Sequence, residues 1–151
     1  MAIQIISKPF GKIEISEKQL IYFHTGLFGF EGYKQFALIE ESAESPFKWL
    51  QSTEEPELAF ILIQPELFTG DYKPLISESE LEELELSTLG DSVIFVIVTI
   101  PHDDPMKMTA NLQGPVIINP KNSAGRQLIS RNENHSVRAR IIDGSPQMEK
   151  V

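Results

Sequence analysis

Residues 93–100 read VIFVIVTI, an uninterrupted apolar run in which β-branched and aromatic side chains dominate. Successive side chains of a strand point to opposite faces, so this run is apolar on both. Such a strand has to be covered on each side, and we expect 93–100 to lie centrally in a sheet. The run is far shorter than the ~20 residues that span a bilayer, so no membrane segment is predicted.

Short runs of strand-forming residues recur along the rest of the chain, separated by Pro and Gly. Residues 12–16 (KIEIS) alternate strictly between apolar and polar, which is typical of a half-buried strand. Together, these runs predict some ten short antiparallel strands, residues 93–100 among them, in one small, mainly β, barrel-like domain over 1–143. The further strands are expected at 2–7, 20–23, 36–39, 47–51, 58–63, 116–118, 127–129 and 137–142.

One short helix is expected near 77–85, in ISESELEELEL. Ser77 and Glu80 have the spacing of a capping box, and Leu81 and Leu84 share a face. A second, very short helical turn is expected around 122–126. We expect residues 144–151 to be a flexible tail.

The charge of the chain is strongly acidic and unevenly distributed. The formal net charge is −9; residues 1–120 contain 7 Lys and 19 acids, giving −12, and residues 121–151 contain 6 Lys or Arg and 3 acids, giving +3. An acidic body repels nucleic acid and favours a basic partner. The chain has no cysteine, which excludes disulfides, thiolate metal sites and cysteine nucleophiles. No signal peptide is visible, so a cytoplasmic location is expected.

The stretch TGLFGFEGYKQF (25–36) contains Gly26, Gly29 and Gly32 at even spacing. A phosphate-binding loop would open a long helix, but residues 36–39 are strand-like and no GK[ST] follows. The three glycines are therefore interpreted as turn residues that permit positive φ.

Catalytic chemistry has little support in the sequence. An alternative to a binding protein is a small-molecule-binding barrel or hydrolase in which His24, His102 and Asp103 converge on a pocket. A weaker alternative is direct RNA binding through a basic set that lacks stacking aromatics. That set is Arg126, Arg131, Arg138 and Arg140.

Several stretches together resemble the flagellar assembly factor FliW family. They are GLFGFEGYKQFALIE (26–40), SPFKWLQS (45–52), TIPHDDPMKMTANLQGPVIIN (99–119) and GRQLI (125–129). The resemblance implies a β-barrel-like regulator, without enzymatic activity or cofactors, that binds flagellin and the RNA-binding translational regulator CsrA. Free FliW holds CsrA and relieves repression of flagellin mRNA, whereas flagellin takes FliW away. The implied partners are thus proteins, with no direct nucleic-acid or membrane contact, and the free chain is expected to be a monomer.

Exposure and charge suggest residues for partner contact, either as aromatic anchors or as acidic groups. They are Phe28, Phe30, Glu31, Glu80, Glu82, Glu83, Asp103 and Asp104. Asn111 is expected to bond a neighbouring backbone group and fix a bend. Pro115, which cannot donate to a ladder, is expected to mark the start of a strand or an edge.

Overall fold

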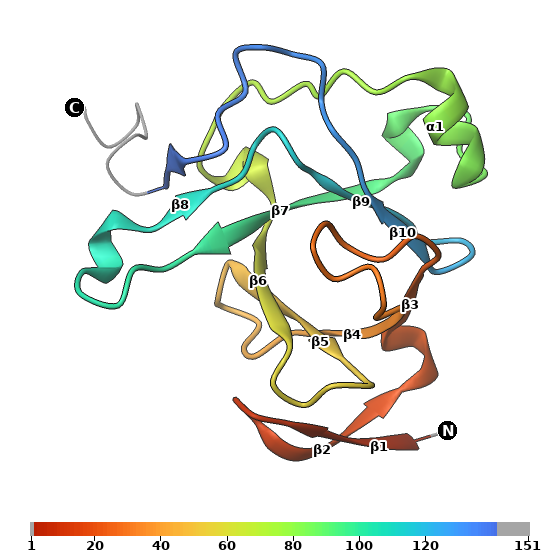
Figure 1. Ribbon diagram of the computed structural model, residues 1–151, viewed down its shortest axis with the longest axis vertical. Helices are drawn as coiled ribbons and strands as arrows, with labels where there is room; N and C mark the ends of the chain where they lie inside the picture. Colours follow the sequence, from red (N-terminus) through yellow and green to blue (C-terminus); the bar gives the residue numbers. More distant parts are fainter. Residues whose placement is uncertain (1, 142–151) are drawn as a thin grey trace.

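The computed structural model describes residues 2–141; the tail predicted at 144–151 and the last two residues of the predicted domain lie outside them. Within the described residues, seven strands form a closed ring, because β7 pairs with both β6 and β9 while β10 pairs with β3 (Figure 1). The ring strands are β3 (Leu20–Phe23), β4 (Gln35–Ile39), β5 (Phe47–Ser52), β6 (Ala59–Ile63), β7 (Val93–Thr99), β9 (Val116–Asn119) and β10 (Ala124–Gln127). Closure into a barrel leaves the ring without a free edge.

The central position predicted for 93–100 is confirmed in β7. Its first three residues pair with β9, and residues 96–98 pair with β6, so the strand closes the ring. Phe95 packs in the cluster inside the barrel, while Val96 and Val98 pack in a second cluster outside it. The apolar character of both faces is thereby explained.

The barrel interior is filled by large side chains from all around the ring. Phe23 and Phe36 are completely buried and meet edge to face, with ring centroids 5.5 Å apart. Gly125 makes room for them, since a Cβ there would lie 2.7 Å from Phe23 Cε2. The interior is therefore filled by a packed hydrophobic core.

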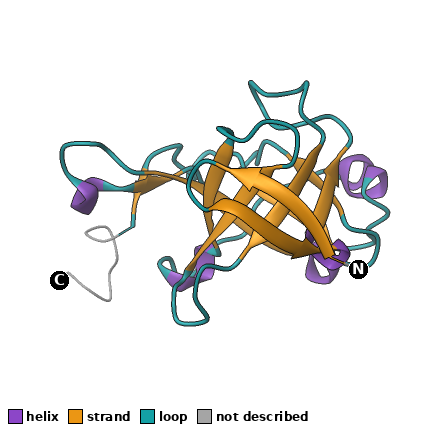
Figure 2. Cartoon of the chain, turned by 90° about the horizontal axis from the view of Figure 1, so that it is seen from below, coloured by secondary structure: helices purple, strands orange, loops and turns teal. Residues whose placement is uncertain are grey.

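Figure 2 shows the strands gathered in the middle of the molecule, with the short helices at its periphery. Three groups of elements pack on the outside of the barrel. The hairpin of β1 (Ala2–Ser7) and β2 (Gly11–Ser16) packs on β3 and β4 through isoleucines and Ala37. The helix α1 (Glu78–Glu83) packs on β9 and β10, and the segment with β8 (Thr109–Ala110) and β11 (Ala139–Arg140) packs on β6 and β7. Short 3₁₀ helices connect these elements: η1 (Glu17–Gln19), η2 (Pro65–Leu67), η3 (Leu89–Asp91) and η4 (Pro105–Lys107).

The helix prediction is confirmed in detail. Ser77 accepts from the Glu80 amide, and the Glu80 carboxylate accepts from the Ser77 amide, which completes the capping box. The helix ends at Glu83, and Glu85 adopts a positive φ of 58°.

Three local predictions near the C-terminal end are wrong. The helical turn around 122–126 does not form, because Ser123 has φ 59° and donates to the Asn119 carbonyl, reversing β9 directly into β10. The strand predicted at 127–129 therefore ends at Gln127, and the strand predicted at 137–142 is reduced to Ala139–Arg140 in the described residues. The expectation of antiparallel pairing holds except for β10, which runs parallel to β3.

Candidate functional site

The loop between β3 and β4, residues 24–34, lies within the ring of strands in Figure 1 and is here called the mouth loop. Leu27, which is 1% exposed, belongs to the interior cluster, so the loop inserts into the barrel end. Gly26 (φ 71°) and Gly29 (φ 86°) have the positive φ predicted for them; Gly32 does not. At Gly26 glycine is also required by space, since a Cβ would lie 2.5 Å from the Cα of Glu31.

The mouth loop is held in place by a side chain from a distant part of the chain. Gln127 Oε1 accepts from the Phe28 amide over 3.0 Å, and Gln127 Nε2 donates to the Gly114 carbonyl over 3.0 Å. Gln127 thus connects three stretches of the sequence: GLFGF, NLQGP and GRQLI. Sequence reasoning missed this residue, because nothing in the spacing of the stretches indicates their contact.

Asn111 has the structural role predicted for it. Its Oδ1 accepts from the amides of Gln113 (3.0 Å) and Gly114 (2.9 Å), which fixes the turn that leads into β9. Pro115 directly precedes β9, as expected for a residue that marks the start of a strand. The carbonyl that Gln127 contacts is therefore itself held by a defined turn.

The outer side of the mouth loop presents aromatic side chains beside carboxylates. Phe28 is 48% exposed and Phe30 38% exposed, and the ring of Phe30 lies edge to face on Phe60. A hollow of about 400 Å³ is lined by Phe30, Tyr33, Glu55, Glu57 and Leu58. Exposed aromatic residues on a fixed backbone have the character of anchors in protein interfaces.

Backbone hydrogen bonds favour the charged form of Glu31. Its carboxylate accepts from the Gly29 amide over 3.1 Å, and backbone hydrogen bonds from its own amide and that of Gly29 lower the pKa of Glu31. Phe28, Phe30 and Glu31 lie in the same loop. We call these three residues, together with the hollow that Phe30 shares with Glu55 and Glu57, the mouth patch.

The acidic residues of the helix lie elsewhere and differ in what they can offer a partner. Glu80 is used in the capping box, and Glu83 forms an ion pair with Arg126. Glu82 is exposed. Glu83 and Arg126 line a cleft of about 480 Å³ that also contains Tyr22 and His24.

Asp103 and Asp104 lie in the loop between β7 and β8, on the opposite side of the molecule from α1 (Figure 1). Asp104 caps η4 by accepting from the Met106 amide over 3.1 Å, whereas Asp103 is exposed. The structure therefore distributes the eight proposed contact residues over three separate places.

The structure does not bring His24 together with His102 and Asp103. The cleft that contains His24 has neither of the other two in its lining, and they follow β7 in the loop that carries η4. Within residues 2–141, no group of three or more His, Cys, Asp or Glu is placed to hold a metal ion. The same part of the chain contains no helix that is long and apolar enough to cross a bilayer.

The arginine set is likewise dispersed. Arg126 is paired with Glu83 in the cleft, Arg131 follows β10, and Arg138 and Arg140 lie at the β11 end of the sheet. Fold and surface thus define a small closed-barrel protein with a filled interior, whose chemically distinctive features are on its outside.

The comparisons with known proteins identify the family. The model of the FliW protein family matches residues 4–141. A flagellar assembly factor FliW from Leptospira biflexa is 58% identical over the whole of both chains, and one from Leptospira interrogans is 55% identical over 96% of this chain and 97% of its own. A crystal structure of the flagellar assembly factor FliW, 35% identical, superposes with a TM-score of 0.84 and covers 99% of this chain and 100% of its own. The chain belongs to the FliW family of flagellar assembly factors.

Proposed function

We propose that this chain is a non-enzymatic, cytoplasmic regulator of flagellar assembly that binds flagellin and CsrA, and that it is a monomer when free. The observation that carries the proposal is membership of the FliW family over residues 4–141, with relatives that match over nearly their whole length named flagellar assembly factors. When the chain holds CsrA, flagellin mRNA is translated. When unassembled flagellin accumulates, it takes the chain away and CsrA represses translation again, so the switch follows relative concentrations and affinities.

The mouth patch supports the CsrA part of this proposal. CsrA has to carry basic residues to contact RNA phosphates. Glu55 and Glu57 line the hollow beside Phe30, and Glu31 is the next residue of the mouth loop. Opposite charges at the rim accelerate encounter, while aromatic side chains at the centre supply affinity. We therefore assign the mouth patch as the CsrA-contacting surface.

The function is tested by competition between the two proteins. Purified chain should capture CsrA in a pull-down, and added flagellin should release it. In a gel shift at modest salt, the chain alone should leave flagellin mRNA unshifted but should dissolve a CsrA–RNA complex. Failure to capture either protein, or a direct shift of RNA by the chain alone, would refute the proposed function.

The assignment of the mouth patch is tested by the double variant Phe28→Ala/Phe30→Ala. Truncation of central aromatic anchors costs about 2 kcal/mol or more in an interface, so CsrA should bind at least ~30-fold more weakly. Leu67→Ala, at an exposed leucine (53%) on η2, is the matched control and should bind as the parent does. Equal affinities for the double variant and the control would remove the mouth patch from the interface.

Charge reversal at Glu82 and Asp103 examines the other two places. Both side chains are exposed, and the substitutions spare the capping box, the Arg126 ion pair and the η4 cap. If either region contacts CsrA, the association rate should fall and its salt dependence should weaken. Unchanged kinetics at low salt would exclude that region.

A further inference from the structure

A groove of about 450 Å³ lies between the β1–β2 hairpin and the end of β4, away from the mouth patch. Apolar side chains and carboxylates together line it. The lining residues are Phe10, Ile13, Glu14, Ile15, Gln19, Ile39, Glu40 and Glu41.

The groove follows an open strand edge. Ile13, Glu14 and Ile15 are consecutive in β2 and point alternately to its two faces, yet all three line the groove. A groove that touches both faces of a strand runs along its edge, and the other edge of β2 is occupied by β1. Within residues 2–141, β1 and β2 form a sheet of their own, so the outer edge of β2 belongs to no further ladder. Such an edge offers backbone donors and acceptors to an added strand.

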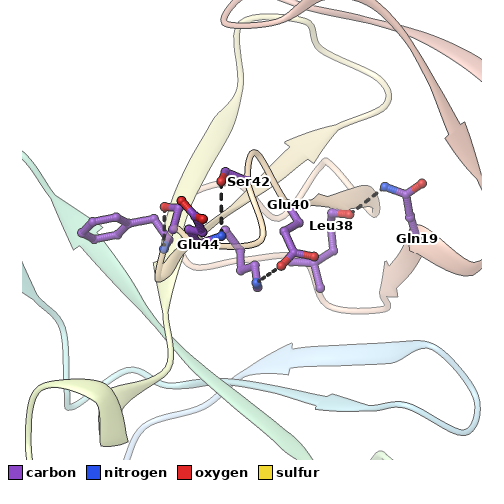
Figure 3. Close-up of polar contacts among 8 residues, drawn as sticks. Gln19, Leu38, Glu40, Ser42 and Glu44 are labelled. Carbon is purple, nitrogen blue, oxygen red and sulfur yellow. Dashed lines mark hydrogen bonds and ion pairs between the residues drawn. The ribbon is translucent and has the colours of Figure 1, made fainter.

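The two walls of the groove are held at a fixed spacing by Gln19. Its Oε1 accepts from the Ser16 amide at the end of β2 over 2.8 Å, and its Nε2 donates to the Leu38 carbonyl of β4 over 3.1 Å. Figure 3 shows the latter bond, beside Glu40. The groove is thus formed before any partner arrives, which reduces the entropic cost of binding.

Two of the carboxylates are also held in position. Lys48 Nζ contacts Glu40 Oε2 over 2.9 Å, the ion pair marked by a dashed line in Figure 3. Trp49 Nε1 donates to Glu41 Oε1 over 3.3 Å, and the indole packs edge to face against Phe10. The lining contains three carboxylates and no lysine or arginine. Glu40 is already paired with Lys48, so Glu14 and Glu41 supply the negative charge that complements a basic, partly apolar segment.

We propose that this groove is a second docking site, which takes an extended segment of another protein with alternating Lys or Arg and aliphatic side chains. The segment adds to the β1–β2 sheet as a third strand along β2. Its aliphatic side chains contact the isoleucines, and its cations face Glu14 and Glu41. A second copy of this chain, paired through its own β2, is the alternative occupant that the test distinguishes.

The test uses fluorescein-labelled peptides in an anisotropy titration with the whole chain. Ac-KVKVKV should bind, and more weakly as NaCl rises, whereas Ac-EVEVEV should not. Ac-KVKPKV removes one backbone donor and should lose most of the affinity, because a strand addition needs that ladder. Equal binding of the acidic and basic peptides, or of the proline and parent peptides, would overturn the proposal.

Variants and amide spectra locate the binding. Glu14→Lys, which reverses one charge in the groove, should weaken the binding of Ac-KVKVKV about fivefold or more. Glu17→Lys is the control, with an equal charge change at an exposed residue of η1 outside the groove lining, and should change the affinity less than twofold. Amide signals of residues 11–16 should shift on binding. Equal effects of the two variants, shifts centred on the mouth loop, or a peptide-free dimer paired through β2 would each refute the assignment. The flagellin competition remains a separate test, so either proposal can fail alone.

Discussion

Replacing Gln127 by Leu should loosen the mouth loop while preserving the volume of the side chain. The variant removes two hydrogen bonds, the one that Gln127 accepts from the Phe28 amide and the one that it donates to the Gly114 carbonyl, and Gln127 is only 6% exposed. A net hydrogen bond is worth about 1 kcal/mol, and a buried polar group left unsatisfied costs about 1–3 kcal/mol. Gly114 is buried, so we expect the free energy of unfolding to fall by about 2–4 kcal/mol.

The measurement combines denaturation with hydrogen exchange. For a domain of this size, each kcal/mol corresponds to about 2–4 °C in Tm, so Gln127→Leu should melt roughly 10 °C lower. The Phe28 amide should exchange at least ~10-fold faster, since its acceptor is lost. Gln4→Leu, at an exposed glutamine of β1, is the control and should alter neither quantity. An unchanged Tm with unchanged exchange at Phe28 would show that Gln127 does not hold the loop.

Three further outcomes are expected. Gly125→Ala should overpack the barrel against Phe23, 2.7 Å from the added Cβ, and lower stability by about 1–3 kcal/mol in urea titrations; a parental midpoint would contradict this. Asn111→Ala should lose both turn hydrogen bonds and about 1–2 kcal/mol, while Asn111→Asp, which keeps the acceptor, should recover most of it. Burial lowers the pKa of His135 from its ordinary 6.5. As the pH falls below 6.5, the unfolded state therefore takes up the proton first, and the stability present above pH 6.5 is lost. His135→Gln should lose less stability over the same pH range, and equal pH profiles of the variant and the parent would contradict this prediction.

The sequence was most informative where one local rule dominates. The two-sided apolar run at 93–100 predicted a central strand, and the Ser77–Glu80 spacing predicted a capped helix, because both depend on residues that are neighbours in the chain. The turn at Ser123 was missed because no local rule decides its conformation. Polar residues at 122–126 suit a helical turn and a hairpin equally, and the pairing of β10 with both β9 and β3 decides between them.

Barrel closure could not be read from spacing alone. It depends on β7 pairing with two strands at once and on the parallel contact of β10 with β3, about a hundred residues apart in the sequence. The same limit applies to the candidate site. The mouth loop contains Phe28, Phe30 and Glu31 because these residues are adjacent in the sequence. The acidic residues of the helix and of the Asp103–Asp104 loop were grouped with them only because they are also acidic. Charge alone says nothing about which elements meet.

The way the barrel is covered explains where partner surfaces remain. The hairpin, the helix and the β8–β11 segment each bury one part of the outer wall, so few apolar side chains on strands reach solvent. Among residues 2–141, ten large apolar residues are exposed; Ile6 and Tyr22 lie in strands, and the other eight lie in loops and 3₁₀ segments. Loop residues can be fixed by single long-range contacts, as Gln127 fixes Phe28. The surfaces that we propose for partners therefore lie on a loop and on the separate β1–β2 sheet, and their use would require no change to the core that holds them.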